Sequence, residues 1–584
     1  MLPRLWGNMN ENAVKRGSLE ENGTGKFSNI DNDSLSYLKW LGVTHVWYTG
    51  IIRHSTKSDT RGCLPSHPQF VKGEAGSPYS ISDYYDVNPY LADNPENRMD
   101  EFESLVSRTH EKGLKVIMDF VPNHVSRDYN GVLGKNDDKS VHWKPENDFF
   151  YYPGQELNLP NSKEYLEECR SFKAADFGRT YKFLPQWLIR KGESCQGDEI
   201  AFSSLVRKNG KILSLYEEMP AKATGNNYSP NPAETDWYDT VKINYCDFHT
   251  STWDKMYDIV RYWAAKGIDG FRCDMVELVP AEFFQWMIAK IKTEFKNLIF
   301  IAEVYQKQNY SKYISQIGFD YIYDKSGLYD SLKSVIRKNL NDSGVPVELW
   351  QSTKTITWNW QFLGSLQSKM LNFLENHDET RFASENFGKK ASYTFAPLYV
   401  SLFLNKAPFL IYFGEEVGEK GMDDEGESDS NGRTTIFDWW SIGSMRKLYK
   451  LVHTDGKDID SFEKAGLETG MDETELKTFA RFTSTIRKAS GDAAISEGSV
   501  YDLCYYNYSS EGFDENRHFA FLRHSKNETL LFFSNFSLKP AKAHIRIPKG
   551  AFDYMHLPES ESFNSQTPIE VDVEPMDAVM INLI

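Results

Sequence analysis

The sequence predicts an α/β protein: a (β/α)8 TIM barrel with an inserted domain after its third strand and a C-terminal antiparallel β-sandwich domain. Three observations support this prediction. A helix-like segment followed by a short apolar run recurs along the chain, and polar residues gather where the apolar runs stop. From about residue 495 the chain keeps strand-like runs but loses the helices between them. At 584 residues the chain exceeds what one hydrophobic core usually holds, so several domains are expected.

The repeating unit is marked by the residue that ends each helix-like segment. Gly42, Gly113, Gly267 and Asn297 each stand between a helical pattern and an apolar run. The left-handed conformation that ends a helix costs little for Gly and is tolerable for Asn. The runs that follow are short and nearly continuous, as in strands covered on both faces. Helices that alternate with such strands predict a parallel sheet.

Eight apolar runs can be placed as strands, the number that closes a (β/α)8 barrel. They lie within residues 2–7, 43–50, 114–120, 268–274, 298–305, 319–324, 370–378 and 407–416. The interval from Asp119 to Asp274 is far too long for one helix and strand, and it is rich in Gly, Asn, Pro and aromatic residues. We therefore expect the barrel in residues 1–124 and 244–490, an inserted domain in 125–243 and a C-terminal β domain in 495–584.

Composition excludes several classes of function. The formal net charge of -17 argues against nucleic acid or an anionic membrane as a partner. The six cysteines form no CxxC pair and no Cys/His cluster, so neither a disulfide framework nor a zinc site is expected. No apolar run reaches the ~18 residues that span a bilayer, so membrane insertion is not expected. Aromatic residues make up 14% of the chain, which suits a large core better than it suits platforms for sugar rings.

The first residues, MLPRLWGNMNENAV, show no basic region followed by an apolar one, so no signal peptide is recognised. This favours a cytoplasmic protein. A periplasmic or secreted protein is the alternative if a leader has been removed. The sequence does not indicate an oligomeric state.

Polar residues gather at the predicted strand ends, which lie together at one face of a barrel. Alternation along a strand places Arg272 and Asp274 on the same side. A structural ion pair would explain any single charged residue at a strand end. Unpaired buried charges cost several kcal/mol each, so a set of charged residues at several strand ends indicates a function. The set comprises Asp119, Asn123 and His124, then Arg272 and Asp274, then Glu303, and finally Asn376, His377 and Asp378.

Three carboxylates, two histidines and an arginine in this arrangement suit glycoside hydrolysis. That reaction needs a carboxylate nucleophile and a second carboxyl group that gives and takes a proton. Arg272 beside Asp274 is expected to hold that carboxylate ionised, as a nucleophile requires. Glu303, at the end of a very apolar strand, is the expected general acid.

Four short segments then match a known pattern. DFVPNH at 119–124, GFRCD at 270–274, AEV at 302–304 and ENHD at 375–378 resemble, in this order, the four motifs of the α-amylase family of retaining glycosidases (glycoside hydrolase family 13). The resemblance covers roughly residues 1–480. It implies that Asp274 is the nucleophile and Glu303 the general acid and base. It also implies that Asp378 binds vicinal sugar hydroxyls and distorts the ring.

The resemblance implies supporting roles as well. Arg272 would orient Asp274, and Asp119 would hold Arg272. His124 and His377 would hydrogen-bond the sugar in the reacting subsite. Tyr79, within SPYSISDYYDVNP, would stack on that sugar, with ordinary packing as the alternative.

The sequence departs from the family pattern just after the nucleophile. Many calcium-containing members have Lys-His three and four residues after it, where this chain has Glu277 and Leu278. That Lys usually meets the leaving chain, and the His helps a calcium site between barrel and insert. No cofactor is therefore expected. Calcium is the alternative, with Asn123 at a frequent ligand position, although Asn123 could equally bridge loops by hydrogen bonds.

The expected function is a retaining glycoside hydrolase that cleaves α-glucosidic bonds of α-glucans or malto-oligosaccharides through a covalent glycosyl-enzyme intermediate. A transglycosylase or isomerase that uses the same intermediate is the alternative. A catalytically silent glycan-binding relative is disfavoured because all three carboxylates are present. The expected partner is an oligosaccharide or polysaccharide, with linkage preference and exo or endo action left open.

Overall fold

The computed structural model describes most of the chain outside the predicted insert. It describes residues 1–60, 65–66, 71–126, 129, 206–207, 211–212, 240–243, 245, 251–341, 346–421, 432–454, 468–526, 528–560 and 563–584. The inserted domain expected at 125–243 thus lies largely outside the described residues. The short strands described in or beside that range are β5 His124–Ser126, β6 Val206–Arg207, β7 Lys211–Ile212 and β8 Thr240–Lys242.

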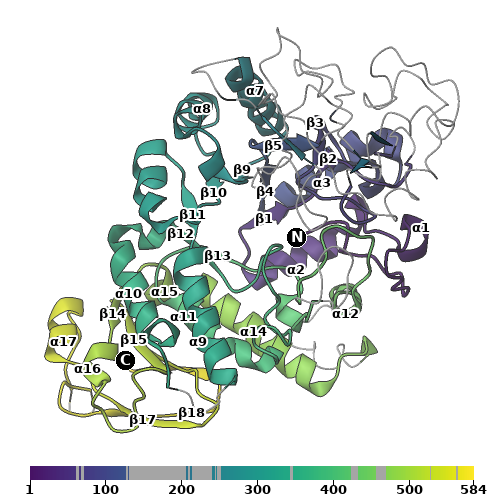
Figure 1. Ribbon diagram of the computed structural model, residues 1–584. Helices are drawn as coiled ribbons and strands as arrows, with labels where there is room; N and C mark the ends of the chain where they lie inside the picture. Colours follow the sequence, from purple (N-terminus) through teal and green to yellow (C-terminus); the bar gives the residue numbers. More distant parts are fainter. Residues whose placement is uncertain are drawn as a thin grey trace, which may run out of the picture.

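A parallel sheet of seven strands curls through the barrel part of the described chain (Figure 1). Each strand pairs in parallel with the next. In sheet order the strands are β1 His45–Tyr48, β4 Lys115–Phe120, β9 Gly270–Cys273, β10 Ile299–Ala302, β11 Tyr321–Tyr323, β12 Met370–Phe373 and β13 Phe409–Leu410. Seven of the eight predicted strands are confirmed by these elements. A separate antiparallel pair, β2 Ile52–His54 and β3 Ile81–Val87, follows β1.

The strand expected within residues 2–7 is wrong, because these residues form consecutive turns. The backbone N–H groups of Leu5 and Trp6 donate to the Leu2 carbonyl at 3.0 and 3.3 Å. Pro3 has no N–H to give to a sheet. Arg4 is buried with its guanidinium over the Trp439 ring, 5.5 Å from the centroid.

The start of the chain nevertheless lies against the first strand. The Met1 amino group donates to the Trp47 carbonyl at 2.7 Å, and the Thr49 N–H donates to the Met1 carbonyl at 2.9 Å. A cavity of about 590 Å³ adjoins this place, lined by residues of β1, β13 and the flanking helices.

Helices pack around the sheet, and their ends explain the repeating pattern (Figure 1). Gly42, Gly113 and Gly267 all have positive φ, which confirms their predicted role in ending helices. Asn297 does not take that conformation; a turn from Phe295 to Leu298 makes the reversal instead. The helices of the barrel part are α1 Leu19–Asn22, α2 Asn32–Leu41, α3 Arg98–Glu111, α7 Ser251–Ala265, α8 Ala281–Glu294, α9 Asp330–Leu340, α10 Lys354–Leu363, α11 Phe395–Phe403, α12 Gly443–Val452, α14 Glu473–Gly491 and α15 Ala493–Ser496.

The described residues of the C-terminal part form two antiparallel sheets and two short helices, drawn in yellow-green to yellow at the lower left of Figure 1. It joins the barrel through aromatic packing: the ring of Phe403 on α11 lies 4.8 Å from that of Phe532 on β16. The elements are β14 Ser499–Asp502, α16 Cys504–Asn507, β15 His518–Ser525, β16 Glu528–Asn535, β17 Ala541–Ile545, α17 Lys549–Met555, β18 Ile569–Val573 and β19 Asp577–Asn582.

The high aromatic content serves the core to a large extent. Trp6, Trp253, Trp263 and Trp439 are among the largest fully buried side chains. Among the described helices, none combines the length and apolar character needed to cross a bilayer.

Candidate active site

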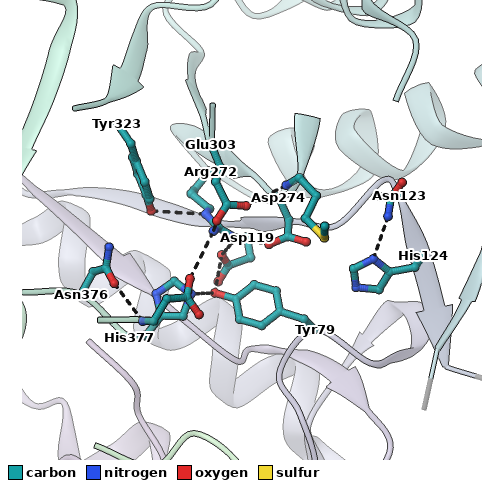
Figure 2. A network of polar contacts seen from close by, with 12 residues as sticks. Tyr79, Asp119, Asn123, His124, Arg272, Asp274, Glu303, Tyr323, Asn376 and His377 are labelled. Carbon is teal, nitrogen blue, oxygen red and sulfur yellow. Dashed lines mark hydrogen bonds and ion pairs between the residues drawn. The ribbon is translucent and has the colours of Figure 1, made fainter. Parts of the chain in front are cut away.

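The buried guanidinium of Arg272 is the centre of the site, and four carboxylates surround it (Figure 2). Its nitrogens lie 2.5 Å from Asp274 Oδ1 and 2.9 Å from Glu303 Oε1. Asp119 Oδ1 and Asp378 Oδ2 are farther away, at 3.6 and 3.9 Å. Residues predicted from four separate strand ends therefore meet around one cation.

Sheet register explains why they meet. Arg272 on β9 pairs with Asp119 on β4. Backbone hydrogen bonds continue beyond the strands: the Asp274 N–H donates to the Phe120 carbonyl at 2.9 Å, and the Glu303 N–H donates to the Cys273 carbonyl at 3.2 Å. The two carboxylates therefore start from fixed backbone positions at the carboxyl edge of the sheet.

Three aromatic rings enclose the guanidinium, and two of them were not predicted. The Arg272 Cζ atom lies 5.6, 5.2 and 5.7 Å from the ring centroids of Trp47, Tyr79 and Tyr323. Rings at such distances stabilise a cation through their negative faces. Trp47 and Tyr323 stand near the carboxyl ends of β1 and β11, so the rule that found the charged residues could also have found them.

Asp274 is less readily ionised than the sequence predicts. Burial raises the pKa of Asp274, the contact with Arg272 lowers it, and the charges of Glu303 and Asp378 raise it again, with a net result well above the ordinary value. Arg272 favours the ionised form of Asp274, as expected, but in the ligand-free site it does not outweigh the opposing effects. The largest of these is burial, and one guanidinium is also shared among four carboxylates.

Glu303 is held by one ion pair and two hydrogen bonds and is 4% exposed. The Arg272 guanidinium and the Tyr305 hydroxyl, the latter at 2.6 Å, both contact Oε1. The Met275 N–H donates to Oε2 at 2.8 Å. Met275 has a left-handed backbone, with φ 47° and ψ 43°, which turns the chain sharply after the nucleophile position and lets its N–H reach Glu303.

Asp378 is the most accessible of the four carboxylates, with a side chain 40% exposed. The Asn376 side chain accepts the Asp378 N–H at 2.8 Å, and His377 Nε2 lies 3.0 Å from Asp378 Oδ2. Burial acts to raise the pKa of Asp378, but His377 and Arg272 lower it below the ordinary value. Asp378 is therefore ionised at neutral pH.

Tyr79 links two strand ends. Its hydroxyl lies 3.2 Å from Asp119 Oδ1 and 2.6 Å from His377 Nε2, and its ring stacks on His377 with centroids 5.2 Å apart. Asp119 also accepts a hydrogen bond from the Trp47 indole at 3.0 Å. Asp119 also lies 3.6 Å from Arg272, the residue it was predicted to hold. The stacking of Tyr79 on a sugar stays a prediction, because here the ring packs on His377 and only 2% of the residue is exposed.

His124 lies to the side of the carboxylate cluster, next to Asn123 (Figure 2). The Asn123 side-chain nitrogen is 3.2 Å from His124 Nδ1. Burial lowers the pKa of His124 to about 3. The imidazole is therefore neutral near pH 7 and suits hydrogen bonding to a sugar better than proton transfer.

A calcium ion does not fit the described residues around Asn123. The Lys242 ammonium, from strand β8, donates to Asn123 Oδ1 and, at 2.7 Å, to the Leu278 carbonyl. A second cation beside that ammonium would be repelled. Among the described residues, no three His, Cys, Asp or Glu side chains form a group that could hold a metal.

Comparisons with known proteins agree with this fold and these motifs. The family profile described as "Alpha amylase, catalytic domain" matches residues 17–174 and 241–481. Neopullulanase 2 of Thermoactinomyces vulgaris is 21% identical over 392 residues, covering 67% of this chain and 49% of that protein. The human amino acid transporter heavy chain SLC3A1 is 22% identical over 328 residues, 54% of this chain and 33% of that protein. The chain thus spans about half or less of the length of these two relatives.

A solved structure supports the fold class. The α-amylase of Geobacillus thermoleovorans, in complex with acarbose, aligns with 100% of this chain and 96% of its own at a TM-score of 0.56 and 17% identity. The predicted (β/α)8 barrel with a C-terminal antiparallel β domain is confirmed by this likeness and by the family match. The profile covers more than half of the chain, and the four motifs meet around Arg272, so this protein belongs to the α-amylase family.

Proposed function

We propose that the protein is a retaining glycoside hydrolase that cleaves α-glucosidic bonds of α-glucans or malto-oligosaccharides. One observation carries the proposal: Asp274 and Glu303 bind different nitrogens of the same buried guanidinium. This holds two carboxyl groups close together, as a retaining enzyme requires. The exposure of Asp378, the third carboxylate, supports a role for it in binding substrate hydroxyls.

In the first step, an ionised Asp274 attacks the anomeric carbon while Glu303 gives its proton to the glycosidic oxygen. The bond from the anomeric carbon to that oxygen breaks, and the leaving sugar departs as an alcohol. The product is a glycosyl ester of Asp274. The partly positive sugar ring of the transition state meets the ionised Asp378 and the attacking carboxylate of Asp274, while Glu303 gains negative charge as its proton leaves; these charges stabilise the developing positive charge.

In the second step, Glu303 acts as a base. It takes a proton from water, the water oxygen attacks the anomeric carbon, and the ester bond to Asp274 breaks. Two inversions restore the α configuration. Arg272 then again neutralises the released Asp274 carboxylate, which its short contact favours.

The remaining site residues are proposed to hold the sugar. Asp378 would accept hydrogen bonds from two vicinal hydroxyls. His377, fixed by Tyr79 and Asp378, would donate to a hydroxyl of the same ring. His124, neutral near pH 7, would complete the polar edge, and Tyr79 would border the ring.

Transfer to a second sugar instead of water is the second candidate, because the same intermediate serves both reactions. The name of neopullulanase 2 supports an α-glucan substrate. The name of the transporter heavy chain shows that a relative can be known for something other than catalysis. Here the arrangement of Asp274, Glu303 and Asp378 around Arg272 favours catalysis.

Proton NMR of fresh reactions tests the proposal, with maltoheptaose for α-1,4 bonds and panose for α-1,6 bonds. Early α-anomeric product is expected, and fragment sizes distinguish hydrolysis from transfer. Early β-anomeric product would contradict the retaining mechanism. Turnover of neither sugar would favour a different α-glycoside or a silent glycan binder.

A further inference from the structure

Tyr305 contacts the proposed acid/base and is itself partly exposed to solvent. It stands two residues after Glu303, and its hydroxyl donates to Glu303 Oε1 at 2.6 Å. Tyr305 is 42% exposed, whereas Glu303 is 4% exposed. A deeply buried carboxyl group is thus capped by a phenol that reaches solvent.

The other two contacts of Glu303 come from buried or chain-fixed positions. Arg272, its ion-pair partner, is 0% exposed, and the Met275 N–H belongs to the turn after β9. Of the three contacts described, only that of the Tyr305 hydroxyl is made by an exposed side chain. A glycosidic oxygen that approaches Oε1 from solvent must therefore compete with that hydroxyl.

The backbone of Tyr305 is fixed by Glu277. The Glu277 carboxylate accepts the N–H of Tyr305 at 2.9 Å and the N–H of Gln306 at 3.3 Å. It also accepts the Asn309 side-chain amide at 2.7 Å. Glu277 follows Asp274 by three residues, so it joins the loop after the proposed nucleophile to the loop after the proposed acid. This carboxylate stands at the position where the sequence departs from the Lys of the family pattern.

We propose that Tyr305 is a positioning residue on the leaving-group side of the site. In the ligand-free enzyme its hydroxyl donates to Glu303 Oε1. The hydroxyl thereby occupies the position that the glycosidic oxygen takes during the reaction. When substrate displaces the hydroxyl, the exposed ring lies against the leaving sugar. Glu277 keeps the Tyr305 backbone still, so that only the side chain moves. This inference rests on the proposed function of Glu303 as acid and base.

Tyr305→Phe separates the hydroxyl from the ring. A hydroxyl that donates to a carboxylate favours the charged form of that carboxylate. We therefore expect the alkaline limb of the kcat/KM profile to move to higher pH when the hydroxyl is removed. The other charged and titratable groups described as interacting with Glu303 are unchanged; they are Arg272 from β9, Asp274 just after β9 and Tyr323 from β11.

Tyr305→Ala removes the ring as well. We expect KM for maltoheptaose to rise about three- to tenfold beyond the effect of Tyr305→Phe, because an aromatic contact to the leaving sugar is lost. Glu277→Gln keeps the shape of the side chain that holds the Tyr305 backbone but makes it a weaker hydrogen-bond acceptor. It should therefore move the alkaline limb to higher pH as well, by a smaller amount than Tyr305→Phe. Tyr310→Phe is the matched control, since it removes the phenolic hydroxyl of a buried tyrosine five residues after Tyr305.

Each variant is measured on maltoheptaose and on p-nitrophenyl α-maltoside, whose leaving group needs little protonation. A shift of the limb by Tyr305→Phe with maltoheptaose only, at an unchanged Tm, supports the positioning role. An unmoved limb together with a normal KM in Tyr305→Ala overturns it. The wild-type rates test the proposed function separately. If the wild type turns over neither substrate, the function and the inference both fail. If the wild type is active and the Tyr305 variants have the same pH profile and KM as the wild type, the inference alone is overturned.

Discussion

Arg272 Nη2 and Glu303 Oε1 are 2.9 Å apart, and both residues are almost completely withdrawn from solvent. The same guanidinium contacts Asp274 through its other terminal nitrogen. This relationship makes the distance between the two carboxyl groups a property of one rigid, planar cation.

The first prediction concerns geometry. The carboxyl groups of Asp274 and Glu303 are expected about 5 to 5.5 Å apart, the separation typical of retaining glycosidases. A crystal structure of the ligand-free protein would measure this distance directly. A separation of about 9 Å would instead leave room for a water molecule and indicate inversion.

The second prediction concerns the proposed acid and base. Glu303→Gln should lower turnover of maltoheptaose by roughly 100-fold or more, because a neutral amide cannot transfer the proton. With p-nitrophenyl α-maltoside, added azide should restore part of the rate, since azide attacks the intermediate without a base. Near-normal turnover of maltoheptaose by a folded variant would refute the assignment.

The third prediction concerns stability. Burial raises the pKa of Asp274 in the folded state, so ionisation of this group opposes folding, and its unfavourable contribution grows as pH rises above the unfolded value. Asp274→Asn should therefore abolish hydrolysis yet raise Tm by about 1 to 3 °C near pH 7.

The pH dependence provides the check. The gain in Tm should shrink as pH falls, because Asp274 of the wild type then takes up a proton and loses its charge. Thermal melts of both proteins across a range of pH would show this. Asp330→Asn, which removes an exposed partner of Lys325, is the control and should change Tm little. A lower Tm for Asp274→Asn at every pH would contradict the prediction.

The fourth prediction concerns calcium. Lys242 supplies the positive charge next to Asn123, so a chelator should leave both activity and Tm unchanged. Lys242→Met leaves Asn123 Oδ1 and the Leu278 carbonyl without this donor and should cost about 1 to 3 kcal/mol in the free energy of unfolding. Loss of activity with the chelator, restored by calcium, would argue for a metal site instead.

Much of the fold was predictable because its signals are local. Gly42, Gly113 and Gly267 mark helix ends through a conformation that only Gly adopts cheaply, and the strands that follow are apolar. The strand predicted at residues 2–7 is wrong because the local sequence does not reveal that Arg4 is buried against Trp439, far along the chain. The left-handed conformation predicted for Asn297 is wrong because a turn can end a helix without a left-handed residue.

The site was predictable where its residues are charged and end a strand. The raised pKa of Asp274 was not predictable, since it depends on burial and on how many carboxylates share Arg272. Lys242 was not predictable either, because its partner Asn123 lies across the whole inserted segment. Tyr305 is two residues from Glu303, but a tyrosine beside an acid gives no signal without knowledge of its rotamer.

The excess of carboxylates over cations around Arg272 has a practical consequence. With four acidic groups and one guanidinium, the empty site carries a net negative charge once more than one carboxyl group is ionised, and it then attracts small organic ammonium ions. Protonated amino alcohols used as buffers will compete with the sugar, and more strongly at low ionic strength. Rates recorded in such buffers will understate the activity of this protein, and basic nitrogen analogues of glucose offer a natural starting point for its inhibitors.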